Sequence, residues 1–269
     1  MGIQTNIEYC DSTANPVWGC DGCELWRPKK RIFRCYAGNI LERCGERFTN
    51  VRYFQNRVAA ALAWSDLTGS RRPAKPWLDG LPRIVFWCDM SDAFTASAPA
   101  WVAEHEAAMR RSPFVHILLT KRPSAMVRWL ASAEPLPETW WLGTSVTSNA
   151  MRPRITHLLK ARDRHPEAKF VVSVEPAWGL VDLEAWLPDL DWIVWGGESG
   201  LNAVRSSWDW ARHLRDQAAV ASVPFFVKQG GSRLATKSAK GGRLDELPAD
   251  LRIRQMPMES IVPEQGELF

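Results

Sequence analysis

The chain has 269 residues and is 46% hydrophobic, which is enough to bury a large core in one domain of barrel size or in two small domains. No run approaches eighteen apolar residues, and the N-terminus lacks the basic, apolar and small-residue order of a signal peptide, so we expect a cytoplasmic protein without a membrane partner. A formal net charge of +4 permits a nucleic-acid partner without requiring one, and six cysteines without a secretion signal favour metal binding over disulfides.

A cysteine-rich loop at residues 18–37 follows a short strand-like run at residues 7–10. Cys20 and Cys23 form a CxxC pair in this loop, and Cys35 follows after eleven intervening residues, directly before a helical pattern. Three thiols in this arrangement suit a metal ion or an iron-sulfur cluster, because soft sulfur ligands select zinc, copper(I) and iron-sulfur centres. The start of a helix adds positive potential that favours the thiolate form.

Two simpler interpretations of these cysteines remain open. They can be small buried apolar residues, since free cysteine is among the most buried residue types. They can also bind a structural zinc ion, for which Cys10 or Cys44 is close enough in sequence to be the fourth ligand. Cys44, however, lies on an apolar stripe of helical period and is expected in the core, which favours three ligands with an open fourth position.

Residues 37–62 carry this apolar stripe and predict one long helix with a break near Gly45. Residues 65–81 are rich in Gly, Pro, Arg and Lys and predict an exposed connection. Residues 83–92 form a continuous apolar run that ends in polar residues, as expected of a strand buried on both faces of a parallel sheet. His116 lies inside a similar run and is expected in the core. Most of the fifteen tryptophans are expected to pack in the core or at its rim, and the others to be stacking platforms for bases or for an adenine ring.

The strand pattern of residues 83–92 recurs at residues 113–122, 139–145, 169–175, 191–200 and 223–231. Amphipathic helical patterns alternate with these runs, at residues 99–111, 124–133, 151–164 and 208–221. With residues 7–10 this makes seven strands and predicts an α/β fold, built as an incomplete parallel (β/α) barrel of six to seven strands. We expect the barrel over residues 1–231 and a C-terminal extension over residues 232–269, whose Ile253 and Met256 pack on the barrel; an open doubly wound sheet is the alternative.

Polar and charged residues gather where these strands end, and an α/β barrel builds its active site at that edge. The residues concerned are Ser91, Asp92, Thr120, Lys121, Arg122, Ser145, Glu175, Glu198, Lys228 and Gln229. The basic members are candidates for binding an anionic substrate or a phosphate group. Gly196 and Gly197 precede Glu198 and either allow close approach of the backbone or simply make a turn.

Eight short motifs follow one another along the chain: residues 15–20 (NPVWGC), 35–37 (CYA), 90–94 (MSDAF), 119–123 (LTKRP), 143–146 (GTSV), 173–176 (SVEP), 196–200 (GGESG) and 226–231 (FVKQGG). In this order they resemble a phage and prophage family with a three-cysteine motif, a family of unknown function that is itself similar to radical S-adenosylmethionine (SAM) enzymes. The common radical SAM signature spaces its cysteines three and then two residues apart, whereas the intervals here are two and eleven.

The resemblance implies a partial barrel that holds a four-iron, four-sulfur (4Fe-4S) cluster by Cys20, Cys23 and Cys35. The fourth iron would chelate the amino and carboxylate groups of SAM, and one electron from a donor would release a 5′-deoxyadenosyl radical that abstracts hydrogen from substrate. By analogy, SAM would be contacted by Ser91, Asp92, Thr120, Ser145, Glu175 and Glu198. The expected substrate-binding residues are Lys121, Arg122, Lys228 and Gln229.

Three functions are therefore weighed. The first is a radical SAM enzyme that modifies or repairs a nucleic acid or nucleotide, served by an electron donor and by a partner protein encoded nearby. The second is a non-enzymatic zinc-binding barrel that binds nucleic acid or a protein partner. The third is a metal-dependent hydrolase that uses Asp89, Asp92, Glu175 and Glu198. It ranks last because none of these carboxylates belongs to an HExxH or DxD motif and the chain has no phosphate-binding loop.

Overall fold

The computed structural model of the chain describes residues 2–98 and 100–259. Its centre is a seven-stranded sheet in which every neighbouring pair is parallel and the strands follow chain order. The strands are β1 (Ser12–Ala14), β6 (Ile84–Trp87), β7 (Val115–Thr120), β8 (Trp140–Ser145), β9 (Lys169–Val174), β10 (Trp192–Gly196) and β11 (Phe225–Gln229). β1 and β11 form the two edges, so the sheet is a curled half barrel and the expected incomplete barrel is confirmed. The doubly wound alternative is wrong, because a sequential strand order has no switch point.

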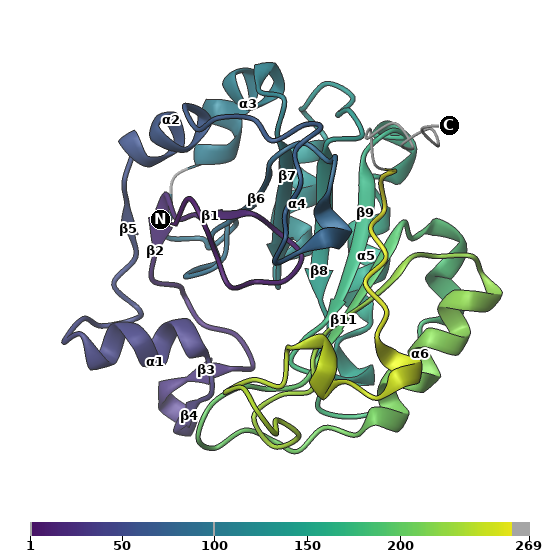
Figure 1. Ribbon diagram of the computed structural model, residues 1–269. Helices are drawn as coiled ribbons and strands as arrows, with labels where there is room; N and C mark the ends of the chain where they lie inside the picture. Colours follow the sequence, from purple (N-terminus) through teal and green to yellow (C-terminus); the bar gives the residue numbers. More distant parts are fainter. Residues whose placement is uncertain (1, 99, 260–269) are drawn as a thin grey trace, which may run out of the picture.

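Six α-helices connect or flank these strands, and Figure 1 shows α1, α2 and α6 at the periphery of the molecule. They are α1 (Tyr36–Arg43), α2 (Asn56–Leu62), α3 (Trp101–Arg111), α4 (Pro123–Leu130), α5 (Pro153–Leu159) and α6 (Trp208–Val220). Two antiparallel ribbons pair β2 (Val17–Trp18) with β5 (Arg52–Tyr53) and β3 (Trp26–Arg27) with β4 (Ile32–Phe33). Short 3-10 helices are η1 (Pro28–Lys30), η2 (Pro76–Leu78), η3 (Asn149–Met151), η4 (Arg162–Arg164), η5 (Glu184–Asp189), η6 (Leu244–Glu246) and η7 (Ala249–Leu251). None of the helices within the described ranges is long and apolar enough to cross a membrane.

The sheet is buried on both faces, which explains the continuous apolar runs of its strands. Alternate residues such as Trp87, Trp140 and Trp195 pack with helices α3 to α6 in two clusters on one face. The residues between them, such as Trp141 and Trp192, form a separate core on the other face. Because the residues of a strand alternate between faces, the polar residues that end the strands continue the second face toward a cavity.

The predictions for His116 and for most tryptophans are confirmed. His116 is fully buried on β7, where its Nδ1 accepts a hydrogen bond from Trp87 Nε1 at 3.1 Å and its Nε2 contacts Met109 O at 2.9 Å. Burial lowers the pKa of His116 to about 4, so the ring is neutral at physiological pH. Six tryptophans are among the largest fully buried side chains: Trp87, Trp101, Trp140, Trp141, Trp192 and Trp195.

The first strand lies later than predicted. Residues 7–10 form a turn instead, and β1 begins at Ser12, which pairs with Val85 of β6. Lys75 explains the difference, because its ammonium group donates to the carbonyl oxygens of Thr5 and Ile7, both at 2.7 Å, and of Cys10 at 2.6 Å. Three carbonyls that converge on one ammonium group bend this segment out of the extended form that a strand needs.

The single long helix predicted over residues 37–62 is also wrong. Helix α1 ends at Arg43, and Gly45 adopts a left-handed conformation with φ of +78°, as helix ends favour, so the predicted break is present. The chain then forms β5 before α2 begins at Asn56. Cys44 is exposed at the end of α1, because the apolar period does not continue through the break. Its expected core position is therefore incorrect.

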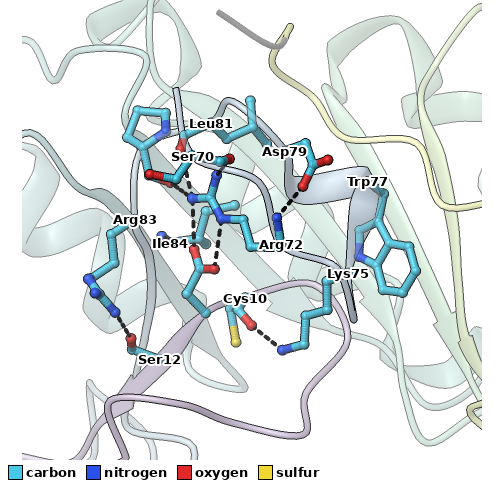
Figure 2. A network of polar contacts seen from close by, with 12 residues as sticks. Cys10, Ser12, Ser70, Arg72, Lys75, Trp77, Asp79, Leu81, Arg83 and Ile84 are labelled. Atoms are coloured by element: carbon cyan, nitrogen blue, oxygen red, sulfur yellow. Dashed lines mark hydrogen bonds and ion pairs between the residues drawn. The ribbon is translucent and has the colours of Figure 1, made fainter. Parts of the chain in front are cut away.

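Residues 65–81 form the predicted connection and are exposed over much of its first part, but its last residues are buried and close the barrel at the end opposite the polar strand ends. Leu78 and Leu81 are buried in the inner core together with Tyr9 and Phe226. Figure 2 draws the polar contacts that fix this segment, among them the one from Lys75 to Cys10. Arg72 Nε donates to Asp11 Oδ1 at 3.2 Å. The composition of the segment did not predict this burial, because its Arg and Lys side chains donate hydrogen bonds to buried backbone carbonyls instead of being solvated.

We expect Arg72→Ala to lower the free energy of unfolding by about 3–5 kcal/mol, because it leaves the Asp11 carboxylate buried without its partner. The two side chains are only 9% and 6% exposed, and Arg72 also donates to Leu81 O at 2.7 Å. Urea denaturation at pH 7 measures the change. Lys237→Ala is the control, since its ion pair with Asp245 is exposed and should leave stability unchanged. Equal effects of the two substitutions would contradict the role given to Arg72.

The C-terminal segment packs along the edge strand β11. Val227 N donates to Ile253 O at 2.9 Å, Gln255 N donates to Phe225 O at 3.1 Å, and Trp192 Nε1 donates to Gln255 O at 2.8 Å. Ile253 and Met256 contact the two clusters beside this edge, as predicted. The segment thus covers backbone groups that an edge strand otherwise leaves unpaired. The last part of the predicted extension, residues 260–269, lies outside the described residues, as does Pro99 of the helix predicted over residues 99–111.

Candidate functional site

A cavity of about 450 Å³ opens at the carboxyl ends of the strands, within the size range of small-molecule and cofactor sites. All thirteen residues that the sequence nominated line it, although the strands that carry them are far apart in the chain. They are Cys20, Cys23, Cys35, Ser91, Asp92, Thr120, Lys121, Arg122, Ser145, Glu175, Glu198, Lys228 and Gln229. These residues therefore lie together at one edge of the sheet, as the sequence pattern predicts.

The eleven residues between Cys23 and Cys35 form a small hairpin, made of β3, η1 and β4. The hairpin closes on Leu25, whose carbonyl oxygen accepts hydrogen bonds from Arg34 N at 2.8 Å and from Cys35 N at 3.1 Å. Trp26 N donates to Cys23 O at 3.0 Å on the other arm. The hairpin therefore projects from the loop, and Cys35 returns to a place beside Leu25, only two residues after Cys23.

Polar contacts bind the cysteine loop to the loops that follow four different strands. The Asp21 carboxylate accepts hydrogen bonds from Thr95 and Ser97 after β6. Arg122, after β7, donates to Gly22 O at 2.7 Å. Arg154, after β8, donates to both carboxylate oxygens of Glu24, at 2.8 and 2.7 Å. The fourth contact joins Arg34 to the loop after β10, so the cysteines are held from several sides.

This fourth contact is a bidentate ion pair between Arg34 and Glu198. Arg34 Nε and Nη2 lie 3.0 Å from Glu198 Oε1 and Oε2, and Nη2 also donates to Asn202 O at 3.0 Å. Trp178 Nε1 and Val204 N complete the set of donors around Glu198, at 2.9 and 2.8 Å. Glu198 is 5% exposed, so this paired carboxylate is a fixed part of the cavity wall.

Beside Glu198 the glycines allow the backbones of two loops to approach closely. A Cβ atom on Gly197 would lie 2.1 Å from Gly230 O, so no larger residue fits between these two loops. A Cβ atom on Gly196 would lie 3.3 Å from the Glu175 carboxyl carbon, on the cavity side. Both glycines therefore serve the packing of the strand ends, beyond making a turn.

The pH dependence of the Glu24 to Arg154 contact follows from its pKa. Burial acts to raise this pKa, but the hydrogen bonds and charge of Arg154 outweigh it and hold the pKa at about 2, below the ordinary 4.5. The stabilisation is complete above pH 4.5 and is lost as the pH falls toward 2. We expect Glu24→Gln to lower the free energy of unfolding by about 2 kcal/mol at pH 7, and by progressively less below pH 4.5. Urea denaturation from pH 7 to pH 2 tests this, and a difference that does not change with pH would disprove it.

Each of the three thiols has a donor or a cation beside it. The Arg122 guanidinium contacts Cys20, Leu25 N lies 3.4 Å from Cys23 Sγ, and the backbone amides of Ala37 and Gly38 point at Cys35, the N-cap of α1. Burial raises the pKa of Cys23 to about 11 and also raises that of Cys35, while the Lys121 ammonium opposes both shifts. Such donors stabilise bound thiolates, so the environment suits a metal-sulfur centre.

The arrangement does not form a compact site for one metal ion. Over residues 2–98 and 100–259, no group of three or more His, Cys, Asp or Glu side chains is placed to hold a single ion. Cys10 is buried in the inner core and Cys44 is exposed at the far end of α1, and neither lines the cavity. Cys88, which ends β6, does line it with the three predicted cysteines, and the sequence analysis did not select it.

The other polar groups divide into fixed and available ones. Asp92 accepts from Thr120 Oγ1 at 2.7 Å and Lys121 N at 2.9 Å and pairs with Arg122, so its oxygens are used within the protein. The hydroxyls of Ser145 and Ser173, in contrast, have no hydrogen-bond partner among the described side chains and face the cavity. The sequence places Ser173 at the end of its strand, two residues before Glu175 on the same face, but Ser173 was not among the predicted cofactor-binding residues.

Glu175 and Lys228 form an ion pair on the opposite wall. Burial acts to lower the pKa of Lys228, but the carboxylates of Glu175 and Glu8 outweigh it and raise the pKa, so the ammonium form persists. Its Nζ also lies 5.4 Å from the centre of the Tyr9 ring. Gln229 donates to Gly197 O at 3.0 Å, while its Oε1 is buried without a partner in the described part of the chain. Tyr9, Tyr36 and Arg34 line the cavity too and were not in the predicted set.

The half-barrel sheet and its cavity define an α/β protein with a cysteine-lined pocket at the carboxyl ends of its strands. The chain belongs to the family described as "Protein of unknown function (DUF5131)", whose profile matches residues 4–253. No curated protein and no solved structure matches the sequence. Because the family has no assigned activity, the function must be argued from the cavity itself.

Proposed function

We propose that this protein is an iron-sulfur, SAM-dependent radical enzyme whose cluster is held by Cys20, Cys23 and Cys35. The observation that carries the proposal is the return of Cys35 to Leu25 at the base of the hairpin, which gathers three thiols in one cavity at the active edge of a half barrel. A 4Fe-4S cluster held by these three cysteines would supply one electron to cleave the C5′–S bond of SAM, releasing methionine and a 5′-deoxyadenosyl radical that would abstract hydrogen from substrate.

The residues of the chain have separate tasks in this proposal. Amide donors at Cys23 and Cys35 and the Arg122 contact at Cys20 stabilise thiolates. Asp92 holds Arg122 and the turn after β7 in place. Groups with unused hydrogen-bonding capacity, Ser145, Ser173 and Gln229, are the ones best suited to contact a bound cofactor or substrate.

The absence of a convergent set of four ligands from the described residues bears on the zinc alternative. A structural zinc ion is bound by four ligands at bond lengths of about 2.0–2.3 Å, which requires their sulfur and nitrogen atoms to converge on one point. No such convergent group occurs in the part of the chain that is described, and the two cysteines considered as a fourth ligand lie away from the cavity. We therefore propose a cluster with three protein ligands and an open position in preference to a closed zinc site.

The test is anaerobic reconstitution with iron and sulfide, followed by metal analysis and electron paramagnetic resonance of the reduced protein. We expect about four irons per chain and a reduced-cluster signal that shifts when SAM is added. Stoichiometric zinc with no iron uptake would instead support the non-enzymatic zinc-binding barrel. If the protein binds neither iron nor zinc tightly, both the radical-enzyme proposal and the zinc-binding alternative are disproved.

A further inference from the structure

The hairpin that separates Cys23 from Cys35 has a strongly basic, exposed tip. Arg27, Lys29, Lys30 and Arg31 are all exposed, and the tip contains no acidic residue. None of the four forms a salt bridge with any described residue, and among their side chains only that of Arg27 donates to a described backbone carbonyl, with Nε at 3.3 Å from Cys23 O. Their combined charge equals the +4 of the whole chain, so the net positive charge of the protein is accounted for by this one hairpin.

Aromatic rings stand beside these cations. Phe33, on β4, is 48% exposed, and Tyr36, at the start of α1, is 46% exposed. The Phe33 ring rests against the buried Trp26, with 5.0 Å between ring centres and an interplanar angle of 77°. Trp26 is held in turn by Phe48, at 5.1 Å. Phe33 is thus a fixed aromatic surface that is open to solvent on one side.

The hairpin stands at the mouth of the cavity. Its last residue, Arg34, and the following Tyr36 line the cavity, and Arg34 joins the hairpin to Asn202 in the loop after β10. In Figure 1 β3 and β4 lie next to the loops that follow β10 and β11. Those loops carry two further exposed cations, Arg205 and Lys240, and Lys240 also lines the cavity.

We infer that this hairpin is a docking surface for single-stranded nucleic acid, and that the cavity acts on a nucleotide of the bound strand. Unpaired cations along a short segment suit a run of phosphates, and an exposed, rigid aromatic ring beside them suits an unstacked base. A duplex does not offer such a base, and chemistry on a base inside a cavity requires that the base leave the stack. The choice of substrate rests on the proposed function, but the docking of a strand does not.

The experiment is fluorescence anisotropy with a labelled 20-nucleotide DNA strand, its RNA equivalent and the DNA duplex, over a series of salt concentrations and without cluster reconstitution. We expect single strands to bind more tightly than duplex. Lys29→Ala/Lys30→Ala/Arg31→Ala should weaken binding at least about tenfold and make the slope of log affinity against log salt less steep by about 2. Phe33→Ala should weaken binding about tenfold with an unchanged slope.

The matched control removes three exposed cations from the helical face, Arg111→Ala/Arg128→Ala/Lys160→Ala, and should bind as the unsubstituted chain does. Circular dichroism confirms that each variant is folded. The inference is overturned if no labelled strand binds, or if the control variant loses as much affinity as the hairpin variant. It is also overturned if heparin displaces the strand and Phe33→Ala has no effect, because the hairpin would then bind any polyanion. Because the assay needs no iron, it gives a result even if the cluster proposal fails. RNA and DNA are distinguished by their relative affinities.

Discussion

Cys35→Ala protein, reconstituted with iron and sulfide, is expected to retain less than about a tenth of the iron of the unsubstituted chain. Cys20→Ala and Cys23→Ala should behave in the same way, because all three thiols line one cavity and each is proposed as one of three protein ligands. Iron and acid-labile sulfide per chain, with the absorbance of the anaerobic protein near 400 nm, measure the loss. Anaerobic handling matters, since an exposed iron of such a cluster is readily oxidised.

The informative control is Cys44→Ala. Cys44 belongs to the same stretch of sequence but is exposed at the end of α1, outside the cavity, so its replacement should leave iron content unchanged. Cys10→Ala should also bind iron, although burial of Cys10 in the inner core makes some loss of stability expected. If Cys44→Ala loses iron as Cys35→Ala does, the ligand set proposed here is wrong.

Sequence reasoning located the cavity because of a general property of parallel strands. When all strands point the same way, their carboxyl ends meet at one edge, so residues such as Thr120, Glu175 and Lys228 come together from runs separated by helices. The pattern did not need the exact strand bounds. It failed where composition was a poor guide to burial, as at Lys75, whose ammonium group satisfies three buried carbonyls in a segment that reads as an exposed loop.

Other features of the site were beyond sequence patterns because they join distant residues. Arg34 and Glu198 are separated by 164 positions, and nothing local to either residue indicates the other. The apolar period that placed Cys44 in the core assumed that a helix continues through Gly45, and the positive φ at that glycine ended it. The eleven-residue interval between Cys23 and Cys35 indicates an excursion of the chain, but only the hydrogen bonds to Leu25 show that this excursion is a hairpin.

The contact between Arg34 and Glu198 should have the second large effect. Arg34 directly precedes Cys35, and the ion pair fixes this end of the hairpin against the loop after β10. We expect Arg34→Met and Glu198→Gln each to lower SAM-dependent turnover about 100-fold, since a displacement of about 1 Å at a reacting centre has an effect of that size. Iron content should stay close to normal, because neither residue is proposed as a ligand.

Three measurements separate this positioning role from a general loss of stability. Trypsin should cleave residues 26–34 faster in both variants, since the hairpin loses its contact with Asn202 or Glu198. The double variant should show a coupling of about 0.5–3 kcal/mol relative to the single changes. Arg162→Met is the matched control, because Arg162 is about as exposed as Arg34 and forms a bidentate pair with Asp191 at the opposite end of β10. If Arg162→Met lowers turnover as much as Arg34→Met, the ion pair at the cavity acts through stability alone, because Arg162 is remote from the cysteines.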